Sequence, residues 1–249
     1  MDSKRVALVT GATSGIGIAI ARRLIKEGFF VVISGRSTER GGAVAAELGD
    51  SGCFIQADLT QPGAPQRLVD AVVEHTGKLD VLVNNAAIDH INWILKTPEE
   101  EIREAFEINT FAAIYCLQAA ARIMAAADGG SIINITSRLA SIGVPTMSLY
   151  SASKGAMLAL TKAASVELAE NNIRVNAVAP GMTRTQMFED WLASQDNPEA
   201  TEREVSAAIP LGRVALPEDV AGAVAYFADP RNSYITGTSL PVDGGYLAK

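Results

Sequence analysis

Seven short apolar runs alternate with helical patterns along this chain of 249 residues. Runs such as residues 6–10, which end in Thr10, and 29–33 are continuously apolar up to their ends; apolar and polar residues do not alternate within them. Strands of that kind are buried on both faces, which requires a parallel sheet with helices on each side. The pattern therefore predicts one doubly wound, three-layer α/β domain that spans residues 1–249.

The order of the expected elements also locates a candidate lid. The strands are expected over residues 6–10, 29–33, 53–57, 79–83, 131–136, 173–178 and 238–242. The helices are expected over residues 16–27, a stretch that ends at 48, 65–75, 98–127, 150–170 and 217–227. Thr97 is the expected N-cap of the longest helix, because three glutamates follow it where the helix dipole favours negative charge. Residues 182–209 are polar and break the pattern, so we expect them to cover a site at the end of the sixth strand.

Charge and composition exclude several classes of protein. The net charge of −7 and the absence of a basic run argue against a nucleic-acid partner. No stretch approaches 18 consecutive apolar residues, so we expect no membrane span. The two cysteines, Cys53 and Cys116, lack the spacing of a metal site, and no signal peptide is evident at the N-terminus. We therefore expect a cytoplasmic protein with free thiols and no bound metal.

A glycine-rich turn follows the first expected strand and contains Gly11, Gly15 and Gly17. Glycines allow the backbone to approach a pyrophosphate, and the next helix offers unpaired N–H groups and a positive dipole end. The spacing G-x-x-x-G-x-G differs from the common dinucleotide fingerprint G-x-G-x-x-G. Its position between a strand and a helix nevertheless favours a nucleotide site over a turn that is merely tight.

Tyr150 and Lys154 are four residues apart and therefore share one face of a helix. An ammonium beside a phenol stabilises the phenolate, so we expect the pKa of Tyr150 to fall from about 10 toward the operating pH. A general acid or base works best there. Ser137 closes the fifth strand and suits a hydrogen bond to the same substrate oxygen. Many amphipathic helices carry a tyrosine and a lysine at this spacing, so the pair alone does not identify a site.

Six motifs occur in a fixed order along the chain: the glycine turn, residues 84–87 with the sequence Asn-Asn-Ala-Ala, Asn109, Ser137, Tyr150 with Lys154, and Pro180 with Gly181. In this order and spacing they resemble the classical short-chain dehydrogenase/reductase family. Segments 210–213, 217–220 and 243–245 extend the resemblance over essentially the whole chain. Ala87 departs from the glycine that is common there, and alanine is tolerated unless φ is positive. The resemblance implies a Rossmann-type fold and NAD(P)-dependent hydride transfer between a carbonyl compound and a secondary alcohol.

The resemblance also implies roles for individual residues. Tyr150 would donate or accept the proton, Lys154 would lower the pKa of Tyr150 and bind the nicotinamide ribose, and Ser137 would hold the substrate oxygen. Asn109 would hold a water that connects Lys154 to solvent. Besides Tyr150 and Lys154, the cofactor would contact Gly11, Ser14, Ile16, Gly17, Arg36, Asp58, Leu59, Asn85, Ala86, Pro180, Gly181 and Thr183. His90, Trp93 and Leu139 join Ser137 and Tyr150 as expected substrate contacts, because they lie in loops at the ligand-binding edge of such a sheet.

Residues 33–37 bear on the choice of cofactor. NAD enzymes of this fold carry an acidic residue at the end of the second strand, and that position is Gly35 here, with Arg36 beside it. A guanidinium matches a phosphate in geometry and charge. We therefore predict a preference for NADP(H), with NAD(H) as a possible cofactor. Ser14 stands where some NADP-preferring relatives carry a basic residue.

The resemblance further implies a homotetramer, formed through the helices over 98–127 and 150–170. The small residues expected at the contacts are Ala112, Ala113, Ala119 and Ala120 on one helix, and Ala152, Ala156, Ala159 and Ala163 on the other. Three alternatives stay open: an NAD-dependent alcohol or sugar dehydrogenase, a member of the extended epimerase/dehydratase branch, and a non-catalytic nucleotide-binding or scaffold protein. The sequence identifies neither the substrate nor the physiological direction.

Overall fold

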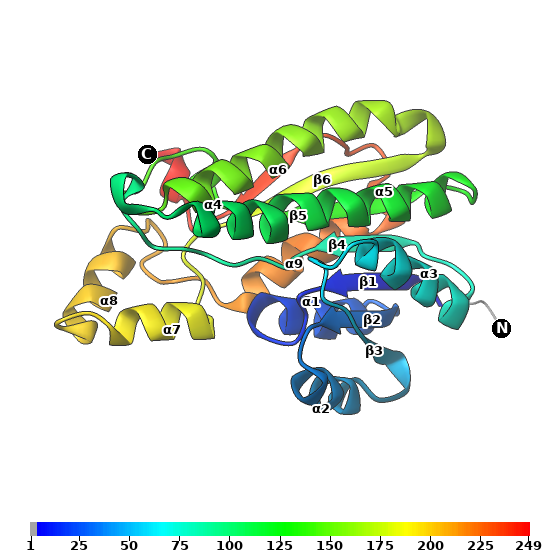
Figure 1. Ribbon diagram of the computed structural model, residues 1–249, viewed down its shortest axis with the longest axis horizontal. Helices are drawn as coiled ribbons and strands as arrows, with labels where there is room; N and C mark the ends of the chain where they lie inside the picture. Colours follow the sequence, from blue (N-terminus) through cyan, green and yellow to red (C-terminus); the bar gives the residue numbers. More distant parts are fainter. Residues whose placement is uncertain (1–3) are drawn as a thin grey trace.

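The computed structural model describes residues 4–249 and contains a seven-stranded parallel sheet (Figure 1). Its strands are β1 (Val6–Thr10), β2 (Phe30–Gly35), β3 (Gly52–Gln56), β4 (Val81–Asn84), β5 (Gly130–Ile135), β6 (Ile173–Pro180) and β7 (Ser239–Val242). The order β3-β2-β1-β4-β5-β6-β7 reverses direction between β1 and β4. This reversal confirms the doubly wound fold, and ligands of such sheets bind outside the carboxyl ends of the strands at that switch point.

Helices cover both faces of the sheet, as the continuous apolar strands require. They are α1 (Gly15–Lys26), α2 (Thr38–Leu48), α3 (Ala64–Thr76), α4 (Glu99–Phe106), α5 (Ala112–Ala125), α6 (Ser148–Glu167), α7 (Gln186–Ala193), α8 (Pro198–Ala207) and α9 (Pro217–Ala228). Successive strand residues point to opposite faces. Val9 accordingly packs with α1, α2 and α9 on one face, whereas Leu8 packs with α3, α5 and α6 on the other.

The single helix expected over residues 98–127 is interrupted in the structure. A π-helical turn, Glu107–Phe111, separates α4 from α5. Pro98 occupies the cap position of α4, so the prediction of Thr97 as N-cap is wrong; the Thr97 hydroxyl donates to the Trp93 carbonyl at 3.0 Å instead. Single π turns inside α-helices occur frequently at functional sites. This one carries Asn109.

The segment Glu99–Ala125 is also the one part of residues 4–249 whose length and hydropathy would suffice to cross a membrane. Sixty-one per cent of its most apolar window is buried inside the domain. Such burial is typical of a core helix that covers a sheet.

The segment expected as a lid forms two helices, α7 and α8. They share a small apolar cluster of Phe188, Leu192, Ile209 and Val214. Arg184 joins the two helices, because its guanidinium pairs with Glu189 of α7 at 2.7 Å and with Glu202 of α8. Residues 182–209 therefore form an ordered cap with its own core.

Candidate active site

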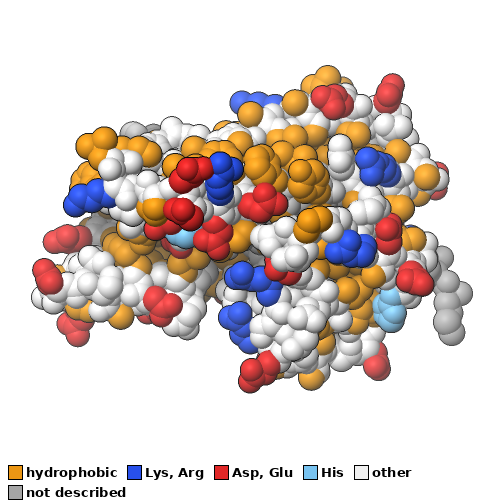
Figure 2. Space-filling view, viewed as in Figure 1, with side chains coloured by type: hydrophobic (Ala, Val, Ile, Leu, Met, Phe, Trp, Pro, Cys, Tyr) orange, Lys and Arg blue, Asp and Glu red, His pale blue; other side chains and the backbone are white. Residues whose placement is uncertain are grey.

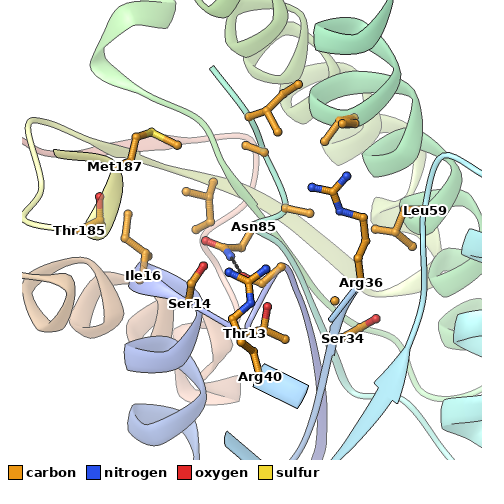
Figure 3. A pocket seen from close by; sticks show the side chains of 18 of the residues that line it. Thr13, Ser14, Ile16, Ser34, Arg36, Arg40, Leu59, Asn85, Thr185 and Met187 are labelled. Atoms are coloured by element: carbon orange, nitrogen blue, oxygen red, sulfur yellow. Dashed lines mark hydrogen bonds between the residues drawn. The ribbon is translucent and has the colours of Figure 1, made fainter. Parts of the chain in front are cut away.

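A cleft of about 310 Å³ lies at the carboxyl ends of the first four strands, where the strand order reverses (Figure 3). Its walls come from the turn after β1, the ends of β2 and β3, the loop after β4, and the first turns of α6 and α7. Ten of the residues expected to bind a cofactor line it: Gly11, Ser14, Ile16, Arg36, Asp58, Leu59, Asn85, Ala86, Tyr150 and Lys154. The structure therefore gathers residues that are up to 143 positions apart into one cavity.

The glycine turn is possible only with glycine at two positions. Gly11 has φ +62°, and a Cβ atom there would lie 2.6 Å from the Cα of Ala86. A Cβ on Gly17 would lie 2.6 Å from both the Cα of Ala12 and the carbonyl oxygen of Gly11. Gly11 thus forms the cleft floor, whereas Gly17 stands behind it and allows α1 to pack close to the turn.

Asn85 braces the loop after β4 against this turn. Its side-chain amide donates to the carbonyls of Thr10 and Gly11, both at 3.0 Å. The Thr10 hydroxyl accepts from the backbone N–H groups of Asn85 and Ala86 at 3.1 and 3.2 Å. These bonds fix the start of the loop, and its next residue, Ala87, lines the cleft.

Two arginines form the far end of the cleft. Figure 3 shows Arg36 after β2 and Arg40 in the first turn of α2, both among the side chains that line the cavity. Within residues 4–249, neither guanidinium forms an ion pair with a carboxylate. A Cβ on Gly35 would lie 2.7 Å from Cγ2 of Thr13, so an acidic side chain cannot stand there without displacing Thr13.

These features fit a dinucleotide with an additional phosphate. The glycine turn leaves open the space that a side chain would fill, and the N-terminus of α1 lies beside it. The Ser34 hydroxyl at the cleft wall is buried and has no hydrogen-bond partner within the described part of the chain. Neither guanidinium forms an ion pair in the described residues, although the charge of Arg36 lowers the pKa of Asp58 on the cleft wall as a minor effect after hydrogen bonds, so both guanidiniums can bind a phosphate.

Lys154 and Tyr150 stand on the first turns of α6, at the other end of the cleft. Lys154 is 2% exposed; its ammonium donates to the Ile135 carbonyl at 2.8 Å and lies 5.7 Å from the centre of the Tyr150 ring. Burial lowers the pKa of Lys154 to about 8. Burial and, secondly, the negative charge of Asp89 raise the pKa of Tyr150 to about 12, against the lowering effect of hydrogen bonding to Ser137.

The expected fall in the pKa of Tyr150 is therefore not found in this structure. The ammonium is directed at a backbone carbonyl and not at the phenol oxygen, so desolvation of the phenolate dominates. The phenol is protonated at neutral pH and is ready to donate its proton.

Asn109, in the π turn, forms hydrogen bonds to the loop after β4 and to α6. Its Oδ1 accepts from the Ile88 N–H, and its Nδ2 donates to the Ile88 carbonyl, each at 2.8 Å. Nδ2 also donates to the Ser153 hydroxyl at 3.1 Å, which in turn donates to the Tyr150 carbonyl at 2.8 Å. Asn109 thereby fixes the loop after β4 and the turn of α6 that carries Tyr150.

The chain matches, over residues 11–247, a family model described as "Enoyl-(Acyl carrier protein) reductase". It is 38% identical to a 3α-hydroxysteroid dehydrogenase of Mediterraneibacter gnavus, over 98% of this chain and 97% of the relative. It is 36% identical to a sorbitol dehydrogenase of Cereibacter sphaeroides, over 98% of both chains. Among solved structures, a substituted form of actinorhodin polyketide ketoreductase with NADPH has a TM-score of 0.93 at 35% identity, covering 99% of this chain and 98% of that one. This chain belongs to the short-chain dehydrogenase/reductase family. It is an NAD(P)-dependent oxidoreductase that acts on CH–OH or C=O groups.

Several residues expected at the site of this short-chain dehydrogenase/reductase lie outside the cleft lining. Pro180 ends β6, Gly181 and Thr183 follow it, and the Thr183 hydroxyl donates to the Gly181 carbonyl at 3.1 Å. Ser137 and Leu139 are buried beside the cleft, and the Ser137 Oγ accepts from the Leu139 N–H at 3.1 Å. Their expected contacts stay predictions.

The two expected substrate contacts in the loop after β4 lie further out. Nε2 of His90 lies 3.1 Å from a carboxylate oxygen of Glu104, on α4. Trp93 is 58% exposed. Neither side chain belongs to the cleft lining, so their contact with a substrate stays a prediction.

The short-chain dehydrogenase/reductase cleft also includes residues that the sequence analysis does not single out. Arg40 is the most important, and its place in the first turn of the helix that follows β2, close to Arg36 in sequence, was a usable signal. Thr185, Gln186 and Met187 contribute from the start of α7, within the segment expected as a lid. No motif marks these three residues.

Proposed function

We propose that the protein is an NADP(H)-dependent oxidoreductase in which Tyr150 exchanges a proton with a carbonyl or secondary-alcohol oxygen. The observation that carries this proposal is one cleft that has the guanidiniums of Arg36 and Arg40 at one end and the Tyr150–Lys154 pair at the other. The NADPH in the related ketoreductase structure supports the cofactor. An NAD-dependent alcohol or sugar dehydrogenase of this fold would carry an acidic residue at the end of β2, where this chain has Gly35.

The chain's own residues supply binding, orientation and a proton, and bound NADPH supplies the hydride. The glycine turn and the arginines hold the phosphates. Ser137 holds the substrate oxygen, and the Tyr150 phenol gives its proton to that oxygen as the carbonyl is reduced. Lys154, whose ammonium lies 5.7 Å from the centre of the Tyr150 ring, is the cation on the same helix that would neutralise the resulting phenolate, which is costly to leave buried without a cation. Asn109 keeps the tyrosine turn and the facing loop in place.

The relatives' names support a small-molecule substrate. They refer to a steroid, a polyol and a polyketide, all of which can carry a ketone or secondary alcohol. We propose the same reacting group here, with no nucleic-acid partner. Both cysteines are free, and burial raises the pKa of the Cys116 thiol to about 12, which suits a reducing cytoplasmic location.

The pH dependence of turnover in both directions tests this function. The pair should lose its first proton near pH 8, because burial lowers the pKa of Lys154 to about 8 and raises that of Tyr150 to about 12. Reduction uses the fully protonated pair, and oxidation uses the form with one proton fewer. We expect kcat/KM for alcohol oxidation to rise about tenfold per pH unit below that pKa and then level off, while carbonyl reduction declines above it. A flat oxidation profile would contradict the proton role, and no turnover with NADP(H) or NAD(H) would contradict the function.

We also propose a homotetramer, although through a different face of α5 from the one expected. The alanines predicted at the contact on α5, including Ala112 and Ala120, are buried inside the subunit, whereas Ala152, Ala159 and Ala163 of α6 are exposed. The outer surface carries Tyr115 (51% exposed) and Val166 of α6 (78% exposed), and Figure 2 shows apolar side chains gathered over these helices.

The exposure of Tyr115 on this outer face predicts that a negative charge at position 115 weakens assembly. Light scattering of the wild type should give four times the 26.2 kDa chain mass. Tyr115→Glu should shift it to smaller species, because a carboxylate would be buried in the contact. Ala46→Glu is the control, because Ala46 is exposed on α2, which packs on the opposite face of the sheet. A monomeric wild type at micromolar concentration would contradict the tetramer.

A further inference from the structure

The cap meets the cofactor cleft at the first turn of α7. Thr185, Gln186 and Met187 line the cleft there. Figure 3 shows Thr185 and Met187 on the same side of the cavity as Ile16. Thr185 packs on the glycine turn, because a Cβ atom on Gly15 would lie 3.3 Å from its Cγ2. The position of α7 therefore determines how closely this wall of the cleft surrounds a bound cofactor.

Arg184, the residue before this turn, is fixed to the body of the domain by its backbone. Its N–H donates to the Ala215 carbonyl at 2.8 Å, and the Ala215 N–H donates to the Met182 carbonyl at 2.9 Å. Thr183 and Ala215 form an isolated parallel bridge at the same place. Ala215 lies two residues before α9, which packs on the sheet beside α1. The backbone of Arg184 is thus held by the domain and not by the cap.

The Arg184 side chain, in contrast, holds both helices of the cap. One guanidinium nitrogen pairs with Glu189 of α7 at 2.7 Å, and another pairs with Glu202 of α8. The guanidinium also lies 5.6 Å from the centre of the Phe188 ring. Neither glutamate forms another ion pair within residues 4–249. Without the Arg184 guanidinium, two like charges would repel each other between α7 and α8.

Few other contacts hold α8 in place. α7 buries Phe188 and Leu192 in the apolar cluster of the cap, whereas α8 has no buried residue. Val205 of α8 packs against that cluster and is only partly buried. A single exposed ion pair contributes little stability, but a planar guanidinium that binds two carboxylates also fixes their directions. Arg184 therefore determines how α8 lies on α7.

We propose that Arg184 is a positioning residue that ties α7 and α8 to the domain and thereby holds the first turn of α7 against the bound cofactor. We call Arg184, Glu189 and Glu202 the latch. The inference rests on the proposed function, because it takes the cleft as the NADP(H) site. Arg184 does not line the cleft in the described chain, so it acts through residues 185–187. Loss of the latch should mainly change how fast the cofactor leaves, as contact mutations usually do.

The dissociation rate of NADPH, followed by stopped-flow fluorescence, tests the latch. NADPH should leave Arg184→Met about 10-fold faster than the wild type, the effect of losing two partly exposed ion pairs. Arg184→Lys keeps the charge without the planar fork, so its rate should lie between the two. Arg203→Met is the matched control, because Arg203 pairs with Glu199 inside α8 at 3.9 Å, and it should keep the wild-type rate. An unchanged unfolding temperature verifies that each variant is folded.

Glu202→Gln distinguishes the latch from ordinary packing. In the wild-type background it removes an ion pair, so NADPH should leave faster. In the Arg184→Met background it removes one of two carboxylates that repel each other, so NADPH should leave more slowly than from Arg184→Met alone. An equal effect in both backgrounds would show that the two residues act independently, and it would overturn the latch.

The remaining outcomes separate the latch from the proposed function. A rate for Arg184→Met within about twofold of the wild type overturns the latch and leaves the proposed function standing. An equal acceleration in Arg203→Met does the same. If the wild type binds NADH and not NADPH, the cofactor assignment fails, and the same rates measured with NADH decide the latch. A wild type that binds neither cofactor overturns the proposed function and this inference with it.

Discussion

The variant Tyr150→Phe should lose about 100- to 10,000-fold in kcat and still bind NADPH with nearly wild-type affinity, because general acid catalysis contributes on that order. The substitution removes one oxygen and keeps the ring that lines the cleft next to Lys154. It therefore removes the proton that would pass to the substrate oxygen without reshaping the cofactor site.

The matched control for this prediction is Tyr226→Phe, which removes the same oxygen from a tyrosine on α9 that is 46% exposed. It should keep wild-type kcat. Steady-state kinetics and a fluorescence titration with NADPH measure the two quantities. If Tyr150→Phe kept more than about a tenth of the wild-type kcat, another group would have to supply the proton.

Removing the two guanidiniums should reverse the cofactor preference. The double variant Arg36→Ala/Arg40→Ala should weaken NADPH binding by about 100-fold or more, because each charged hydrogen bond contributes on the order of 1.5–3 kcal/mol. NADH has no phosphate on the adenosine ribose, so its affinity should change little. Neither arginine forms an ion pair in the described residues, and the effect of Arg36 on the pKa of Asp58 is minor, so their loss should barely affect stability.

Arg22→Ala is the matched control for the double variant, because its guanidinium pairs with Glu47 on the surface and does not line the cleft. The readout is the ratio of the dissociation constants for NADPH and NADH. A ratio that is the same in the double variant and the wild type would mean that both arginines point to solvent in the complex.

The fold was predictable because its main determinant is local. Leu8 and Val9 are neighbours in sequence and both are fully buried, which only a sheet with helices on both sides allows. The break between α4 and α5 was not predictable, because residues 107–111 contain no proline or glycine. The π turn accompanies the bonds between Asn109 and Ile88, which are contacts between segments 21 residues apart.

The site was predictable in its residues but only partly in its chemistry. Spacing identifies Tyr150 and Lys154 as neighbours on α6, and the structure places both in the cleft. Spacing does not reveal that the ammonium bonds the Ile135 carbonyl, nor that Tyr150 is buried, and burial is the main cause of the raised pKa of Tyr150. The alanines of α5 failed as an interface for a similar reason, since a small residue suits a core contact as well as a subunit contact.

Transfer of deuterium from NADPH labelled on the reactive face of the nicotinamide to a ketone substrate tests the central claim most directly. The account predicts an alcohol that carries one deuterium on the carbinol carbon, formed by the wild type and suppressed about 100-fold or more in Tyr150→Phe. Label that appears equally fast in both proteins would contradict the role of Tyr150. Label that comes only from NADH would contradict the assignment of NADP(H).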